Sequence, residues 1–115
     1  MKKVEYSQIV RRKLKTLRVR LTNEFGLEVS KKSLRQITNA ARSLEKFAER
    51  GVAVSEMYDI QCDYRYLYVG HNYLFYRIEA DKIIIAEMFD DREDFMYKLF
   101  GISTTAPESI DYWDE

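Results

Sequence analysis

The spacing of apolar residues in the first half of the chain is the feature that most limits how it can fold. Between Ser7 and Gly26, apolar side chains recur every three or four residues, which is the period of one helix face. They are Val10, Leu14, Leu17, Leu21 and Phe25. Ser7 suits an N-cap and Gly26 a C′ position, so the pattern predicts a helix from Ser7 to about Glu24.

A second apolar stripe of the same period begins near Ser30 and is closed by Gly51. Its members are Leu34, Ile37, Ala41, Leu44, Phe47 and Ala48. Two amphipathic helices joined by a short loop are expected to form an antiparallel hairpin. The apolar stripes of such a hairpin need a common surface to cover.

Strand-like segments in the second half supply that surface. Tyr64 to Val69 and Tyr73 to Glu79 are rich in aromatic residues, and the intervening Gly-His-Asn (70–72) predicts a three-residue hairpin loop. Lys82 to Phe89 is apolar on both faces at 83–86, which indicates a central strand covered on both sides. A short strand from Lys3 to Tyr6 precedes the first helix. The order indicates an α+β fold, an N-terminal antiparallel helical hairpin packed on a small, mainly antiparallel sheet.

The segment D-D-R-E-D-F-M-Y-K-L-F-G (90–101) predicts a short C-terminal helix that completes this fold. Asp90 suits the N-cap and Glu93 the N3 position of a capping box, and Gly101 ends the helix. Arg92 is the exception, since a cation in a first turn opposes the helix dipole. Either Arg92 pairs with its acidic neighbours, or it is held there for a function.

Charge is distributed unevenly, although the formal net charge of the 115 residues is zero. Residues 1–50 hold 14 Lys and Arg against 5 Asp and Glu, whereas residues 51–115 hold 5 against 14. Either the basic half has an anionic partner such as nucleic acid, or the two halves neutralise each other in the fold. Arg11, Lys15 and Arg18 form a row at helical spacing on the first helix. That row is either a solvated face or a docking surface for RNA, DNA or an acidic protein segment.

Several classes of protein are excluded by composition. Cys62 is the single cysteine, which excludes a disulfide framework and a thiolate metal cluster. No metal and no cofactor are expected. No apolar run reaches 18 residues, and no apolar segment follows the two lysines at the N-terminus. We therefore expect one cytoplasmic domain without membrane contact.

Residues 64–101, Y-R-Y-L-Y-V-G-H-N-Y-L-F-Y-R-I-E-A-D-K-I-I-I-A-E-M-F-D-D-R-E-D-F-M-Y-K-L-F-G, resemble the RelE/ParE superfamily of type II toxin–antitoxin toxins. The matching features are two strands, a third apolar strand, an Arg-Asp-aromatic signature and a closing Leu-Phe. The helical hairpin with its F-A-E-R-G close (47–51) is similar too. The resemblance covers residues 1–101 as a single toxin domain, with residues 102–115 as an acidic tail beyond it. It implies growth inhibition through translation or DNA gyrase, neutralised by a cognate antitoxin.

The resemblance leaves the mechanism open, because RelE-like members cleave mRNA on the ribosome whereas ParE-like members inhibit gyrase without a nuclease site. Against the common His-Gly-Arg-Arg-Asp-Tyr signature, Arg92 and Asp94 match the first arginine and the aspartate. Asp90, Glu93 and Phe95 stand where histidine, the second arginine and tyrosine are usual. These departures favour a ParE-like, non-cleaving toxin. The alternatives are a metal-independent mRNA endoribonuclease and a non-toxic interaction module that retains the fold.

Two groups of candidate site residues follow. Arg65, Arg77, Arg92 and Tyr73 are candidates for catalysis or phosphate contact, and the competing interpretation of the arginines is pairing with nearby acids. Tyr64, Tyr66 and Tyr68 alternate along one strand and therefore share one face. That face is predicted to bind a partner, to pack within the protein, or to stack bases.

Two further residues carry separate predictions. His71, the only histidine, is expected to be a solvated turn residue. Trp113 in the acidic tail is a candidate for partner binding. The tail is expected to fold back or to pair with a second copy of the chain in a homodimer.

Overall fold

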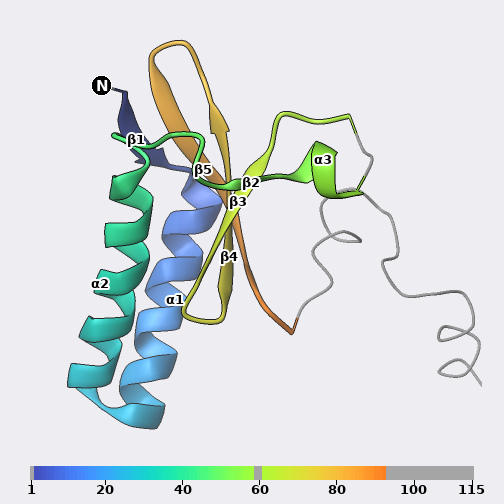
Figure 1. Ribbon diagram of the computed structural model, residues 1–115. Helices are drawn as coiled ribbons and strands as arrows, with labels where there is room; N and C mark the ends of the chain where they lie inside the picture. Colours follow the sequence, from blue (N-terminus) through green and yellow to red (C-terminus); the bar gives the residue numbers. More distant parts are fainter. Residues whose placement is uncertain (1, 59–60, 93–115) are drawn as a thin grey trace, which may run out of the picture.

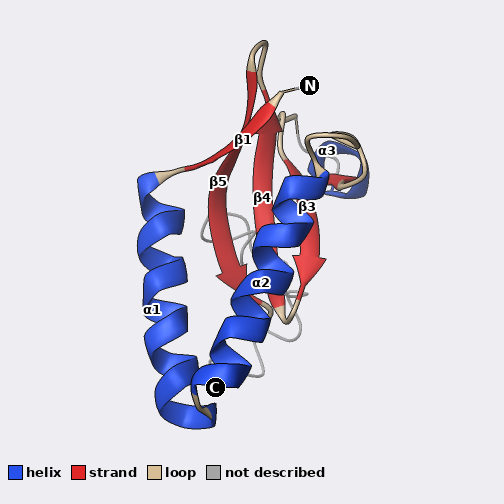
Figure 2. Ribbon diagram, turned by 90° about the vertical axis from the view of Figure 1, so that its left-hand side faces the viewer, coloured by secondary structure: helices blue, strands red, loops and turns tan. Residues whose placement is uncertain are grey.

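The computed structural model describes residues 2–58 and 61–92, which form two helices against a five-stranded sheet. Along the chain these elements are β1 (Lys3–Tyr6), α1 (Gln8–Phe25), α2 (Leu27–Ser43), β2 (Val52–Ala53), α3 (Val54–Tyr58), β3 (Arg65–Val69), β4 (Asn72–Ile78) and β5 (Lys82–Asp90). Helices α1 and α2 lie side by side over one face of the sheet, and the short α3 lies beyond the opposite face (Figure 1). Seen from the helical side, α2 crosses in front of β4, and α1 runs beside β5 (Figure 2). The expected α+β fold is confirmed.

The sheet has the strand order β1-β5-β4-β3-β2 and is mixed. Strand β1 runs parallel to β5, with Lys3 opposite Lys82 and Tyr6 opposite Ile85, whereas every other neighbouring pair is antiparallel. The sheet is therefore mainly antiparallel, as expected. The sequence did not indicate the parallel pair, nor β2 and α3.

Ser7 joins the first strand to the first helix and also fastens the helix to the sheet. Its Oγ accepts a hydrogen bond from the Val10 backbone N–H at 3.2 Å, which confirms the predicted N-cap. The same hydroxyl donates to the Ala86 carbonyl oxygen at 2.9 Å, and the Ser7 N–H donates to the Ile85 carbonyl oxygen at 2.9 Å. One residue thus sets both the start of α1 and its position on β5.

The second helix is shifted towards the N-terminus relative to the prediction. It begins at Leu27 and not near Ser30, because Gly26, with φ +95°, reverses the chain within one residue and caps both helices. It ends at Ser43, well before Gly51, and hydrogen-bonded turns follow. Beyond the helix the predicted stripe is confirmed at Leu44, which is fully buried, and is wrong at Phe47, which is 65% exposed because the helix has already ended.

The hairpin between β3 and β4 has a two-residue turn where a three-residue loop was expected. Gly70 and His71 have φ of +53° and +66°, and Val69 pairs directly with Asn72. Positive φ at both central residues is typical of a type I′ turn, which matches the twist of the flanking strands. Asn72 is a strand residue, and its side-chain amide donates to the Gly70 carbonyl oxygen at 2.8 Å.

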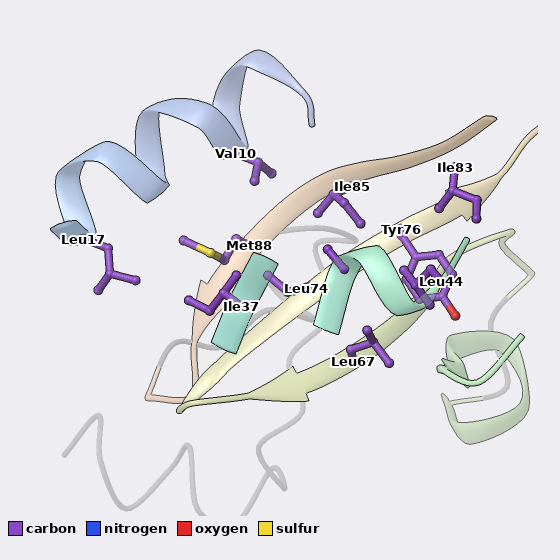
Figure 3. Close-up of a cluster of buried hydrophobic side chains, with 11 residues drawn as sticks. Val10, Leu17, Ile37, Leu44, Leu67, Leu74, Tyr76, Ile83, Ile85 and Met88 are labelled. Carbon is purple, nitrogen blue, oxygen red and sulfur yellow. The ribbon is translucent and has the colours of Figure 1, made fainter. Parts of the chain in front are cut away.

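The sheet carries apolar clusters on both faces. On the helical side, side chains of α1 and α2 meet those of β3, β4 and β5, as Figure 3 shows. The labelled members are Val10, Leu17, Ile37, Leu44, Leu67, Leu74, Tyr76, Ile83, Ile85 and Met88. A smaller cluster on the opposite face contains Val54, Tyr66, Phe75 and Phe89. Strand β5 is indeed internal, between β1 and β4.

Part of the predicted chain lies outside the described residues. The C-terminal helix beyond Arg92, the acidic tail and Trp113 fall there, so those predictions stay predictions. Among the helices of residues 2–58 and 61–92, none is long and apolar enough to cross a membrane.

Candidate functional site

The β3–β4 turn and the end of β5 bring three polar side chains together. Tyr68 Oη donates to Asp91 Oδ2 at 2.7 Å, and His71 Nδ1 lies 3.0 Å from the same oxygen. The Asp91 backbone N–H donates to the His71 carbonyl oxygen at 2.8 Å, which ties the turn to the strand end. The hydrogen bond to Asp91 raises the pKa of Tyr68 above its usual value. The sequence predicted a solvated His71, and its side chain is 83% exposed.

Arg92 lies beside this group and is paired with Asp90. Its Nε donates to Asp90 Oδ1 at 3.0 Å, and its backbone N–H donates to the same oxygen at 2.9 Å. These bonds lower the pKa of Asp90 below its usual range and raise that of Arg92 further. Asp90 therefore caps the following backbone, as an N-cap residue would. Of the two interpretations of Arg92, the structure shows pairing with an acidic neighbour.

A cleft of about 540 Å³ separates this group from the tip of the helical hairpin. Apolar side chains line its helical side, namely Leu17, Leu21, Phe25 and Val29. Charged and polar groups line the rest, among them Arg20, Glu24, His71, Asp90, Asp91 and Arg92. Phe25 is 61% exposed. An apolar wall with charges of both signs at its rim suits a protein segment better than a phosphate.

The candidate residues Arg65 and Arg77 lie at the opposite end of the sheet. Arg65 Nη1 donates to the carbonyl oxygens of Glu49 at 3.2 Å and Gly51 at 2.9 Å. Arg77 pairs with Glu79 at 3.3 Å and lies 5.8 Å from the centre of the Tyr64 ring. Arg65 is opposite Tyr76, the neighbour of Arg77 in β4, so the two arginines point to different faces. The structure does not bring them together with Arg92.

The candidate tyrosines do share one face of the sheet, the one away from the hairpin. The Tyr73 ring centre lies 5.4 Å from that of Tyr66 and 5.0 Å from that of Tyr68. Tyr64 packs against the same apolar cluster. Tyr66 is buried, whereas Tyr68 is 53% exposed and reaches the turn. The predicted tyrosine face exists, and Tyr73 belongs to it.

The basic row on α1 is exposed at Arg11, Lys15 and Arg18. A neighbouring cation that the sequence did not single out is bound to the sheet. Lys13 Nζ lies 2.7 Å from Glu87 Oε1, donates to the Met88 carbonyl oxygen at 2.8 Å, and is 4.3 Å from the centre of the Phe89 ring. Because β1 pairs only with residues 82–85, this lysine covers the edge of β5 beyond β1.

Tyr76 is a buried polar residue that sequence reasoning missed. Its hydroxyl donates to the Ala48 carbonyl oxygen at 2.7 Å and accepts from the Gly51 N–H at 2.9 Å. Burial raises the pKa of this hydroxyl. No local signal distinguishes Tyr76 from the other tyrosines, because both partners lie more than 20 residues away. Its role is to hold the segment after α2 against β4.

Metal ligands are not gathered anywhere in the described ranges, 2–58 and 61–92. No three His, Cys, Asp or Glu side chains in these ranges lie close enough together to hold an ion.

Comparison with known proteins shows which family this chain belongs to. No curated protein matches the chain. Among solved structures, a chain from the "Chromosomal ParDE TA system from P. aeruginosa" is similar at a TM-score of 0.66 and 15% identity, covering 78% of this chain and 96% of that one. At that identity the likeness shows the fold. The family model described as "ParE toxin of type II toxin-antitoxin system, parDE" matches residues 4–95, which is well over half of the sequence. The chain therefore belongs to the ParE toxins of type II toxin–antitoxin systems, within the RelE/ParE superfamily that its second half resembles.

Proposed function

We propose that this toxin arrests growth by binding DNA gyrase and does not cleave mRNA. Membership of a toxin–antitoxin family implies an antitoxin partner, and we propose that a cognate antitoxin encoded with the toxin neutralises it in the cytoplasm. The observation that carries the non-cleaving mechanism is the separation of the three candidate arginines described above.

Cleavage of RNA without a metal needs a base, an acid and cations around one phosphate. Arg65 and Arg77 lie at one end of the sheet on different faces, whereas Arg92 follows the far end of β5. Each of the three already contacts oxygen atoms of the protein itself. This geometry gives no common site for a scissile phosphate among the described residues, which supports inhibition by binding.

The second candidate function is ribosome-dependent mRNA cleavage, and one observation favours it. Asp91 holds His71 Nδ1 at 3.0 Å, and a carboxylate that orients one ring nitrogen leaves the other for proton transfer. Tyr68 and Arg92 lie at the same end of the sheet. A nuclease rebuilt around His71 would then replace the residues that the family signature lacks here.

Growth after induced expression separates the two functions. Wild type, Arg92→Ala, His71→Ala and the exposed-cation control Lys46→Ala are compared for growth, mRNA integrity and supercoiling of a reporter plasmid. We expect arrest with intact mRNA and altered supercoiling in the wild type, His71→Ala and Lys46→Ala. Early mRNA cleavage that His71→Ala abolishes would overturn the gyrase proposal in favour of the nuclease. Absence of arrest in the wild type would contradict both.

The surfaces proposed for partners are the cleft at the hairpin tip and the tyrosine face. The tip exposes Phe25, Leu27 and Val29 to 61%, 53% and 43%, and exposed apolar side chains of this size mark interaction sites. Tyr68 is the exposed member of the tyrosine face. We propose that the antitoxin covers the tip, and binding of a Phe25→Ser variant tests this. Unchanged antitoxin affinity for Phe25→Ser would move the contact to the tyrosine face.

A further inference from the structure

The helical hairpin is far more basic than the rest of the described chain. Helices α1 and α2 together contain ten Lys and Arg against two acidic residues, Glu24 and Glu28. Nine of the ten cations are exposed, and Lys13 is the half-buried exception. A layer with this excess of one sign attracts polyanions over a distance of several ångströms.

Six of these cations form two exposed rows, one on each helix of the hairpin. At about 100° per residue, each row lies on the same flank beside the buried stripe of its helix, which begins at Val10 in α1 and at Ser30 in α2. We refer to these six as the outer face: Arg11, Lys15 and Arg18 on α1, and Lys31, Arg35 and Arg42 on α2. Helices α1 and α2 are antiparallel neighbours (Figure 2), and Ser30 Oγ donates to the Arg18 carbonyl oxygen at 3.1 Å, so the row on α1 lies on the flank next to α2.

No outer-face residue forms an ion pair in the part of the chain that the structure describes. The ion pairs found there join Lys13 to Glu87, Lys82 to Glu5, Arg77 to Glu79, His71 to Asp91 and Arg92 to Asp90. None of them includes an outer-face residue. Of the two interpretations of charge in the sequence, mutual neutralisation therefore does not hold for this face among the described residues.

The composition of the outer face distinguishes between anionic partners. Protein interfaces have an apolar centre from which charged residues are depleted, whereas interfaces with DNA are polar and strongly positive. Val19, 51% exposed, is the large apolar residue close to the outer face, and the exposed Phe25, Leu27 and Val29 lie at the hairpin tip. The outer face contains no aromatic ring on which an unpaired base would stack. These features favour a duplex backbone over both an acidic protein and a single strand.

The dimensions of the outer face agree with this choice. At 1.5 Å per residue, Arg11 to Arg18 extends roughly 10 Å and Lys31 to Arg42 roughly 16 Å. Duplex DNA carries one phosphate charge for about every 1.7 Å of its axis. The outer face therefore lies opposite several phosphates at once, and four of its six cations are arginines, which bind phosphate through two parallel hydrogen bonds.

We propose that the outer face binds the phosphate backbone of duplex DNA without reading its sequence. This activity goes beyond gyrase inhibition and does not depend on it. Such binding would hold the toxin on DNA. The toxin could then reach an enzyme that works on DNA by moving along the duplex as well as by diffusing through solution.

The test is fluorescence anisotropy of a labelled 24-base-pair DNA duplex titrated with the full-length chain, with folding checked by circular dichroism. If five or six cations contact phosphates, log Kd against log salt should have a slope of about 4.5 to 5.5. The variant R11Q/K15Q/R18Q should lower that slope by roughly 2 to 3 and weaken binding at least about tenfold at 50 mM salt. A second variant, K31Q/R35Q/R42Q, should do the same from the other helix.

The control K2Q/K3Q/K82Q removes the same number of charges from the start of β1 and β5, outside the outer face, and should bind as the wild type does. Equal losses in the control and the outer-face variants would show attraction by net charge alone and would overturn the proposal. So would the absence of an anisotropy change at 50 mM salt, or tighter binding of the single strand or of a hairpin RNA. Binding of a poly-glutamate peptide without binding of the duplex would assign the outer face to an acidic protein instead. Gyrase inhibition is measured separately, so failure of one proposal leaves the other standing.

Discussion

The two ends of the sheet use their polar groups in opposite ways. At the Gly51 end, defined by Gly51, Arg65 and Tyr76, side chains bond to backbone atoms and Tyr76 is fully buried. At the His71 end, defined by Tyr68, His71, Asp91 and Arg92, side chains bond mainly to each other, and three of the four are more than half exposed.

The difference indicates which end holds the fold and which is available for a function. Removing a buried hydroxyl leaves its hydrogen-bond partners unsatisfied. Because water does not reach them, the loss lowers the free energy of unfolding. Exposed ion pairs contribute little to stability because water and salt compete for both charges. Substitutions at the Gly51 end should therefore destabilise the protein, whereas those at the His71 end should leave its stability nearly unchanged.

Gly51→Ala should have the largest effect on stability. A Cβ at this position would lie 2.7 Å from Tyr76 Cε1 and 2.8 Å from the Tyr66 carbonyl oxygen, so the backbone would have to move. We expect a loss of roughly 1–3 kcal/mol in the free energy of unfolding, measured by urea titration. Val52→Ala at the next, exposed position is the control and should change stability by less than about 0.5 kcal/mol. Equal stability of both variants would mean that the segment after α2 is not held as described.

Tyr76→Phe should have the next largest effect. It keeps the ring but removes the hydroxyl that joins Ala48 to Gly51, and it leaves the Gly51 N–H without its acceptor. The expected loss is about 1–2 kcal/mol in the same titration. Tyr68→Phe makes the identical change at the His71 end and should be nearly neutral. If Tyr68→Phe cost as much as Tyr76→Phe, the contrast between the ends would be wrong.

Alkaline pH should weaken the Gly51 end through Tyr76. Burial raises the pKa of Tyr76 above the value near 10 that it has in the unfolded chain. Tyr76 therefore loses its hydroxyl proton at a lower pH in the unfolded chain than in the folded protein. Its contribution to stability is complete below about pH 10 and falls as the pH rises above that value. Unfolding free energies at pH 7, 9 and 10.5 should therefore fall less in Tyr76→Phe than in the wild type. A parallel fall in both proteins would assign the effect to other groups, such as Tyr6 or Tyr68.

Asp91→Asn should have the smallest effect on stability. It removes the carboxylate that raises the pKa of Tyr68, so this pKa should fall towards its ordinary value. Comparison with the ultraviolet titration of Tyr68→Phe isolates the absorbance change that belongs to Tyr68. The thermal midpoint of Asp91→Asn should stay within roughly 2 °C of the wild type. An unfolded Asp91→Asn variant would show that the His71 end also carries the fold.

Much of this fold could be predicted from the sequence because its signals are local. The Ser7 cap, the apolar stripes of α1 and α2 and the three long strands all rest on spacings of a few residues. Errors arose where one residue has two roles. Gly26 ends α1 and also caps α2, and Asn72 is a common turn residue that pairs here as a strand residue.

The candidate site was less predictable, because its contacts join distant segments. Pairing of Arg92 with an acidic neighbour was one of the two interpretations that the sequence offered, since Asp90 is separated from it by a single residue. The joining of Tyr68 and His71 to Asp91 was not, because it depends on the turn meeting the end of β5, about 20 residues later. The same holds for the contact of Lys13 with Glu87.

The parallel pairing of β1 with β5 has a consequence for how the toxin comes into being. Strand β1 can pair only after its partner, 79 positions later in the chain, has been synthesised. At 5–20 residues per second, a ribosome needs roughly 4 to 16 s to add those residues. During that interval the nascent chain has a hairpin of helices but no completed sheet for it to cover. A chain released before Lys82 has no β5 to pair with β1. We therefore expect toxicity to be acquired late in synthesis, and a single stop codon before β5 to prevent it.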